Sequence, residues 1–329
     1  MVPQRMLLAL VTAIFVMAAP SSALAASDPV LLVAGLAGGS GSTVGPGGAI
    51  YVPENETGRI VRVDPRTGAV TTFATGLPPL LPGGIGGAMD VAFIGSTAYV
   101  LVTLVGADIG GSDVVGIYRV DGPASHTVIA DIGAFSLAHP PQTAFFVPTG
   151  VQYSLQVYRG GFLVTDGHHN RVLHVTLDGT ITEWVTFGNI VPTGLAVSGN
   201  TVYIAQAGPV PHLPGNGKIV SVTPQSLDAP AVVAAGAPLL VDVEFGRGRT
   251  LLALAQGHFT EGHPEGSPAD PDTGALVMAN ADGTFTVIAE GLDRPTSLEV
   301  IGNSAYVVTL AGEIWRIDDV ASPPYGTAR

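Results

Sequence analysis

The chain has 329 residues, of which 47% are hydrophobic and only 12% are charged, so it can bury a large core and is not an intrinsically disordered protein. Its formal net charge of -13 argues against binding to nucleic acid or to anionic lipid. The absence of cysteine excludes disulfides, thiolate nucleophiles and cysteine-ligated metal sites.

The first residues have the pattern of a secretory signal peptide. Arg5 precedes an apolar run over residues 6–19, and small residues follow as Ala23-Leu24-Ala25. The run is shorter than the roughly 20 residues that a membrane-spanning helix needs, and no second run approaches that length. We therefore predict a signal peptide over residues 1–26 and a mature protein that is secreted, either extracellular or in the cell envelope, without a membrane span.

From residue 27 onward the chain repeats one order of short β-strand patterns. A lone strand is expected at 30–36, and each later unit contains an innermost, a second, a third and an outermost strand, separated by turns rich in Gly, Asp and Asn. The last unit lacks its outermost strand. The six units are expected at 43–77, 90–133, 150–188, 194–236, 242–292 and 297–318.

Four strands repeated six times predict an all-β fold, a six-bladed β-propeller of four-stranded antiparallel blades. We expect the strand at 30–36 to complete the sixth blade and close the ring, because an unpaired edge would invite aggregation. No amphipathic helix of the length that a doubly wound α/β fold requires is visible. The propeller is expected to span residues 27–320 as a single domain, followed by a tail at 321–329.

The segment Asp166-Gly-His-His-Asn170-Arg171-Val172 resembles the turn and third strand of an NHL-type repeat. With the Pro148-Thr-Gly150 and Pro192-Thr-Gly194 segments and the signal peptide, nearly the whole mature chain resembles the ScyD/ScyE family of secreted six-bladed propellers. The resemblance implies the fold and transfers no catalytic residue. The family is named for its association with scytonemin biosynthesis, and most of its members have no assigned activity.

In a propeller, the segments that lead into the innermost strands and out of the second strands gather at one end of the axis, here called the mouth. We expect the ligand-binding residues there. They are Glu54, Asp166, His168, Gln206, Gln256 and His258. Asp and Thr side chains at such turns also commonly bind their own backbone, which is the structural alternative.

Two acidic side chains, Asp90 and Asp242, occupy corresponding positions in different blades. Oxygen ligands suit Ca²⁺ or Mg²⁺, so we predict that these residues bind such an ion on the propeller axis. His168 and His169 follow Asp166, and one of them could face the channel as a ligand or general base, whereas both cannot do so easily from a tight turn. The long loop at 257–273, which contains His258, is interpreted as a solvated lid.

The favoured prediction for function is a non-enzymatic scaffold, a monomer that binds a small molecule, a glycan or an extracellular protein. It depends on the neutral hydrogen-bonding residues at the mouth and on the lack of an evident nucleophile. The alternative is a metal-dependent hydrolase, lactonase or lyase that acts on a small molecule at the mouth. A structural role in an envelope or matrix is the third hypothesis.

Overall fold

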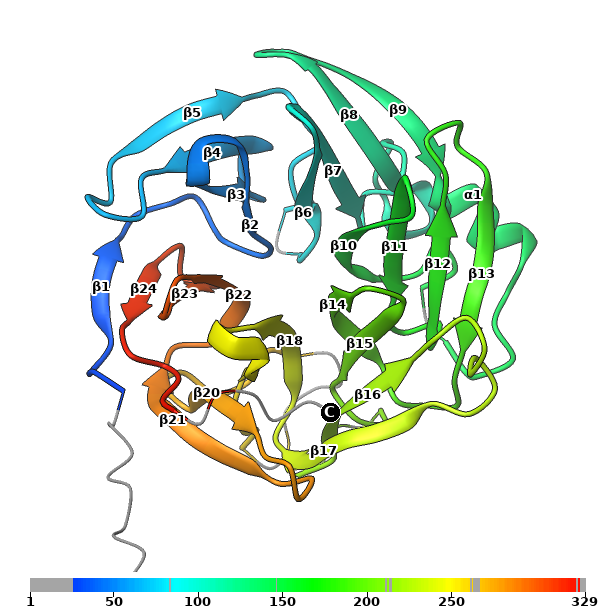
Figure 1. Ribbon diagram of the computed structural model, residues 1–329. Helices are drawn as coiled ribbons and strands as arrows, with labels where there is room; N and C mark the ends of the chain where they lie inside the picture. The colour runs from blue at the N-terminus through cyan, green and yellow to red at the C-terminus, as the bar shows by residue number, and fades with distance from the viewer. Residues whose placement is uncertain are drawn as a thin grey trace, which may run out of the picture.

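The computed structural model describes residues 26–82, 84–145, 147–210, 212, 215–260, 262, 267–323 and 325. The predicted signal peptide therefore lies almost entirely outside the described residues. Six four-stranded antiparallel sheets are arranged around one axis like the blades of a propeller (Figure 1). The predicted fold class is confirmed.

Blades 1 to 5 follow the chain from their innermost to their outermost strand, and blade 6 takes its outermost strand from the start of the propeller. Blade 1 contains β2 (Thr43–Val44), β3 (Ile50–Glu54), β4 (Arg59–Val63) and β5 (Val70–Ala74). Blade 2 contains β6 (Gly87–Ile94), β7 (Thr97–Thr103), β8 (Gly116–Gly122) and β9 (Ser125–Asp131). Blade 3 contains β10 (Gln152–Tyr158), β11 (Gly161–Asp166), β12 (Arg171–Val175) and β13 (Ile181–Thr186). Blade 4 contains β14 (Pro192–Ser198), β15 (Thr201–Gln206), β16 (Gly217–Val222) and β17 (Ala231–Ala237). Blade 5 contains β18 (Leu240–Phe245), β19 (Leu251–Ala255), β20 (Gly274–Ala279) and β21 (Phe285–Leu292). Blade 6 contains β22 (Pro295–Ile301), β23 (Ser304–Thr309), β24 (Ile314–Ile317) and β1 (Val30–Val33).

The two ends of the propeller meet in blade 6, as the sequence predicts. β1 pairs antiparallel with β24, in a register that places Val30 opposite Arg316. Ser27 strengthens this closure, because its backbone N–H donates to the Asp318 carbonyl at 3.0 Å. The closing strand removes a sheet edge that would otherwise be free to pair with another chain.

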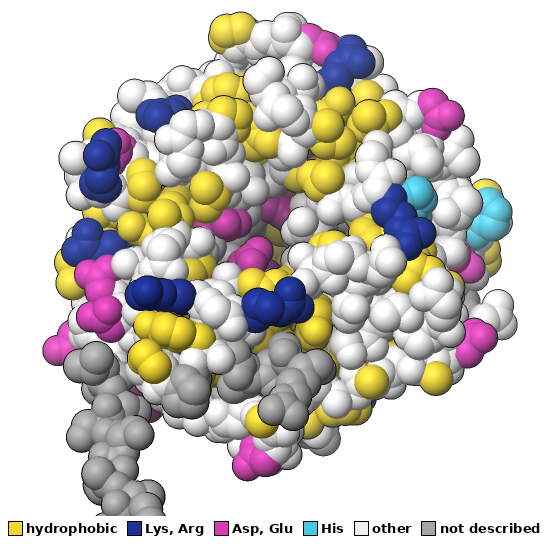
Figure 2. Space-filling model, viewed as in Figure 1, with side chains coloured by type: hydrophobic (Ala, Val, Ile, Leu, Met, Phe, Trp, Pro, Cys, Tyr) yellow, Lys and Arg dark blue, Asp and Glu magenta, His cyan; other side chains and the backbone are white. Residues whose placement is uncertain are grey.

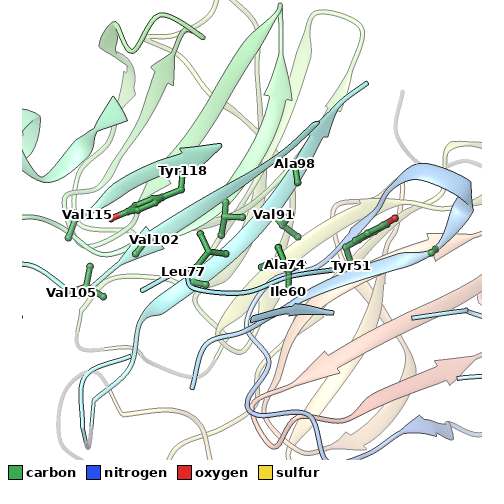
Figure 3. Close-up of a cluster of buried hydrophobic side chains, with 13 residues drawn as sticks. Tyr51, Ile60, Ala74, Leu77, Val91, Ala98, Val102, Val105, Val115 and Tyr118 are labelled. Atoms are coloured by element: carbon green, nitrogen blue, oxygen red, sulfur yellow. The ribbon is translucent and has the colours of Figure 1, made fainter. Parts of the chain in front are cut away.

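The hydrophobic core lies between blades. Second strands such as β3, β11 and β19 are buried along their whole length, because both of their faces pack against neighbouring sheets. Between blades 1 and 2, Ile60, Ala74, Val91 and Val102 point toward one another (Figure 3). Equivalent clusters fill the other five interfaces, so the fold is stabilised by packing around the entire ring.

One segment differs from its predicted strand. The sequence places an outermost strand over 127–133, whereas β9 ends at Asp131 and a short helix, α1 (Ile132–Ala138), begins there. Asp131 caps this helix, because its carboxylate accepts a hydrogen bond from the Ala134 N–H at 2.7 Å. Three 3₁₀ turns occur at Pro46–Gly48, Ala107–Ile109 and Arg247–Arg249. In the part of the chain that the structure describes, no helix is long and apolar enough to span a membrane.

Candidate active site at the propeller mouth

All six blades contribute to a cavity of about 160 Å³ at the mouth. Its wall combines residues at the start of innermost strands, such as Thr193 and Thr296, with residues that follow second strands, such as Asn55, His168 and Gln256. The repeat places these positions at the same end of every blade. A cavity that no single blade forms is therefore assembled only when the ring closes.

His168 and Tyr153 contact each other in the cavity wall. His168 is held in the turn between β11 and β12, and Tyr153 lies on β10 of the same blade. The His168 Nε2 and Tyr153 hydroxyl oxygen are 3.1 Å apart. Because β10 and β11 are paired, the sheet itself fixes the distance between the two side chains.

Burial sets the charge of both groups. Burial, followed by the neighbouring His212, lowers the pKa of His168 to about 4, so this imidazole is neutral at neutral pH. Burial also raises the pKa of Tyr153 well above its usual value, so the phenol keeps its proton. The pair therefore places a neutral base beside a protonated weak acid.

A second imidazole, that of His212, reaches the cavity from the segment that follows β15. Its ring stacks on Phe259 from blade 5, with centroids 6.3 Å apart and an angle of 10° between the planes. Burial lowers the pKa of His212 as well. Its Nδ1 is buried and has no hydrogen-bond partner among the described residues.

The residues next to His168 anchor the turn and do not line the cavity. Asp166 is fully buried and accepts hydrogen bonds from Gln152 Nε2 at 2.9 Å and from Arg171 Nε at 2.8 Å. His169 lies 3.0 Å from the same carboxylate and donates from Nε2 to the Val147 carbonyl at 3.0 Å. The structure thus directs one of the two adjacent histidines to the cavity and uses the other to fix the turn.

Blade 1 repeats this anchor. Glu54 is fully buried, is paired with Arg59, and accepts a hydrogen bond from the Ala37 N–H at 3.0 Å. The Glu54 and Arg59 positions match those of Asp166 and Arg171 in blade 3. Both acidic side chains are therefore engaged behind the mouth rather than within it.

The axial channel is a second cavity, of about 240 Å³, formed by the next residues along the innermost strands. Figure 2 shows acidic side chains in the hollow at the centre of the ring. The carboxylates that line this channel are those of Asp90, Asp242, Glu244 and Glu299.

The channel aspartates hold adjacent blades together. Asp90 Oδ2 accepts from the Leu155 N–H at 2.7 Å, and Asp242 Oδ2 accepts from the Leu298 N–H at 2.8 Å. Glycine is required beside each carboxylate, because a Cβ at Gly41 would lie 2.3 Å from Asp90 Oδ1 and one at Gly194 would lie 2.4 Å from Asp242 Oδ1. A glycine of one blade, an aspartate of the next and a backbone N–H of the third therefore meet in blades 1–3, and the same three groups meet in blades 4–6.

Burial raises the pKa of every channel carboxyl group. The pKa of Asp242 rises to about 7, and the pKa of Glu244 rises to about 8 because of burial and then the charge of Asp242. The pKa values of Asp90 and Glu299 are also raised, first by burial and then by neighbouring carboxylates. At neutral pH these carboxyl groups are therefore not all ionised, since burial and neighbouring like charges both oppose ionisation.

The described residues contain no group of three or more His, Asp or Glu side chains placed to hold a metal ion. Asp90 and Asp242 both line the channel, but each already accepts two backbone N–H groups. Binding of Ca²⁺ or Mg²⁺ by this pair therefore stays a prediction, which titration and elemental analysis would test.

The other predicted ligand-binding residues have different surroundings. Gln256 lines the mouth cavity, and its Oε1 accepts from the Ala269 N–H at 3.1 Å. Gln206 is buried with an Oε1 that has no partner among the described residues, and it does not line the cavity. His258 is exposed in the 257–273 loop. Glu261, His263 and Glu265 of that loop lie outside the described residues.

Sequence reasoning missed Tyr153 and His212. Tyr153 lies directly after Gln152 in an innermost strand, and only its pairing with β11 brings it to His168. His212 belongs to a Pro-rich segment that leaves a second strand, the same kind of position that singled out His168. The position of His212 after a second strand was therefore the sequence signal that could have identified it as a cavity residue.

No profile of a known protein family matches the chain, and no curated protein is significantly similar to it. Solved structures do resemble it. A virginiamycin B lyase from Staphylococcus aureus has a TM-score of 0.50 at 13% identity, covering 88% of this chain and 98% of the lyase. A gluconolactonase from Xanthomonas campestris has a TM-score of 0.60 at 12% identity, covering 88% and 89% of the two chains. An aldose sugar dehydrogenase from Streptomyces coelicolor has a TM-score of 0.54 at 14% identity, covering 88% and 96%.

At these identities the similarities establish the six-bladed propeller fold. They also count against the favoured prediction of a non-enzymatic scaffold, because the three structures named above are those of a lyase, a lactonase and a dehydrogenase, which agrees better with the alternative prediction. The scaffold prediction depended on a mouth without evident reactive groups. The sequence does not reveal the contact between His168 and Tyr153, which places an imidazole beside a phenol in the cavity wall.

Proposed function

We propose that this protein is an enzyme that cleaves the carbon–oxygen bond of a lactone or other ester bound at the propeller mouth. The observation that carries the proposal is the His168 and Tyr153 pair in the cavity wall, with Nε2 and the hydroxyl oxygen 3.1 Å apart. A neutral imidazole can accept a proton, and a phenol can stabilise an oxygen that gains negative charge. The lyase and lactonase similarities support this class of reaction.

In hydrolysis, the water oxygen bonds to the ester carbonyl carbon and the water proton passes to His168 Nε2. The imidazolium then returns the proton to the departing alkoxide as the carbon–oxygen bond breaks. In elimination, His168 takes a proton from the carbon adjacent to the one that carries the ester oxygen, a carbon–carbon double bond forms, and the carboxylate leaves. In both reactions, the Tyr153 O–H turns from Nε2 to the oxygen that becomes negative.

The test is turnover of a set of lactones and esters by the purified protein, followed by mass spectrometry. Hydrolysis adds the mass of water to an opened lactone, whereas elimination yields a product of unchanged mass. We expect His168→Gln and Tyr153→Phe to lower kcat/KM by roughly 10²- to 10⁴-fold, the usual contribution of general acid–base catalysis. His126→Gln is the matched control, since His126 lies on the outermost strand β9 and does not line the cavity.

The pH profile gives an independent check. Because His168 must be neutral and its pKa is lowered to about 4, kcat/KM should rise through about pH 4 and then level off toward neutrality. A rise centred near the ordinary imidazole pKa, or full activity in His168→Gln, would remove His168 as the base.

Membership of the ScyD/ScyE family and export from the cell are also part of the proposal. The NHL-like segment at 166–172 and the N-terminal pattern at residues 5–25 support them. Recovery of the protein from culture medium with an N-terminus near residue 27 is the expected result, and retention of residues 1–26 would contradict export.

A further inference from the structure

We infer that the mouth cavity selects an uncharged, mainly apolar ester and discriminates against polyhydroxylated or anionic substrates such as sugar lactones and sugar acids. This inference rests on the proposed function for its reaction, but it concerns which ligand the cavity binds. The two can therefore fail separately.

The cavity wall is mainly apolar. No Asp, Glu, Lys or Arg is among the described residues that line it, and its polar groups are the neutral ones of Ser, Thr, Asn, Gln, Tyr and His. Burying hydroxyl or carboxylate groups against hydrocarbon costs free energy unless each finds a partner. The apolar part of the wall includes Ile85, Met89, Val191, Leu239, Val241 and Leu310.

Two acidic side chains that the sequence places at the mouth do not line the cavity. Glu54 and Asp166 are fully buried behind it and are paired with Arg59 and Arg171. The two histidines that do face the cavity are no substitute for a cation, because burial lowers the pKa of both His168 and His212. An anionic ligand would meet no positive charge in the described wall.

The volume fits this chemistry. A buried apolar cavity of about 150 Å³ accommodates a benzene-sized body, and the mouth cavity has about 160 Å³. A lactone ring or a short alkyl chain therefore fills the enclosed part, with the remainder of the ligand at the rim. Ile85, which is 49% exposed, lies at that rim.

The experiment compares two δ-lactones that share a six-membered ring, δ-decalactone with an alkyl chain and glucono-δ-lactone with hydroxyl substituents. We expect kcat/KM for the alkyl lactone to be at least about tenfold higher than for glucono-δ-lactone, because the alkyl chain is removed from water against the apolar wall. Calorimetry with the corresponding unreactive lactams measures binding without turnover. Ile85→Arg should lower affinity for the alkyl lactam several-fold, whereas Val232→Arg, a change at another exposed apolar residue on β17 away from the cavity, should not.

Each outcome decides something. Preference for the alkyl lactone in turnover supports both proposals. Equal or better turnover of glucono-δ-lactone overturns the inference and leaves the reaction intact. If neither lactone reacts but only the alkyl lactam binds, the proposed reaction fails and the inference stands. If the alkyl lactam does not bind, or binds no better than the sugar lactam, the inference is wrong.

Discussion

Removing one channel carboxyl group should make the protein less sensitive to alkaline pH, and Glu244→Gln is the sharpest such change. The Glu244 Oε2 accepts a hydrogen bond from the Phe245 N–H at 2.7 Å, and a glutamine can keep that bond through its amide oxygen. The substitution therefore deletes a charge that Asp242 opposes, while the backbone contact is retained.

The sign follows from the raised pKa. The pKa of Glu244 rises from 4.5 to about 8, so the folded protein holds this proton more tightly than the unfolded chain. The stabilisation is complete below about pH 4.5 and is lost as the pH rises through about 8. A pKa difference of this size corresponds to at most about 5 kcal/mol. Glu244 retains some exposure to the channel, and water there stabilises the charged form, so we expect roughly 2 kcal/mol.

The assay is urea unfolding of both proteins at pH 5 and pH 9. The free energy of unfolding should fall by roughly 2 kcal/mol more in the wild type than in Glu244→Gln, because groups outside the channel cancel in the difference. Loss of the Glu244 charge also relieves the pKa of Glu299, which acts in the same direction. Glu290→Gln, an exposed change on β21, should behave like the wild type. Parallel losses in wild type and Glu244→Gln would refute the reasoning about charge in the channel.

Two further predictions concern stability. Arg171→Met leaves the Asp166 carboxylate buried without its cation and should lower the free energy of unfolding by about 3–5 kcal/mol. The control is Arg66→Met, whose wild-type side chain is 86% exposed, and it should change that free energy by less than about 1 kcal/mol. Equal effects of the two substitutions in denaturant titrations would contradict this account. Deletion of residues 27–33 exposes the edge of β24 and should produce aggregates or pairing between copies in light scattering; a monomer with an unchanged unfolding midpoint would show that ring closure contributes little.

The sequence predicts the scaffold well because each blade is encoded locally. Turns such as Asp178-Gly179 and uniformly apolar second strands mark the repeat, and the strand at 30–36 has no partner nearby in sequence, so it must pair with the last unit. The exception at 127–133 arises because the Asp131 side chain can cap a helix as readily as it can end a strand.

The candidate site is less predictable because it depends on which way each side chain points. Asp166 and His168 are two residues apart, yet one is sealed behind the turn and the other faces the cavity. Tyr153 and His212 reach the same space from different blades, which is a consequence of ring geometry rather than of any local motif.

The way the two ends of the chain are fastened has a consequence for synthesis. Ser27 bonds to Asp318, 291 residues further along, so a segment made early pairs only after a much later one has been made. During that interval β1 has no native partner, and the growing arc of blades has two open ends. Completion of the circle is thus a late step that depends on contacts distant in sequence, and conditions that hold nascent chains apart should improve the yield of native protein.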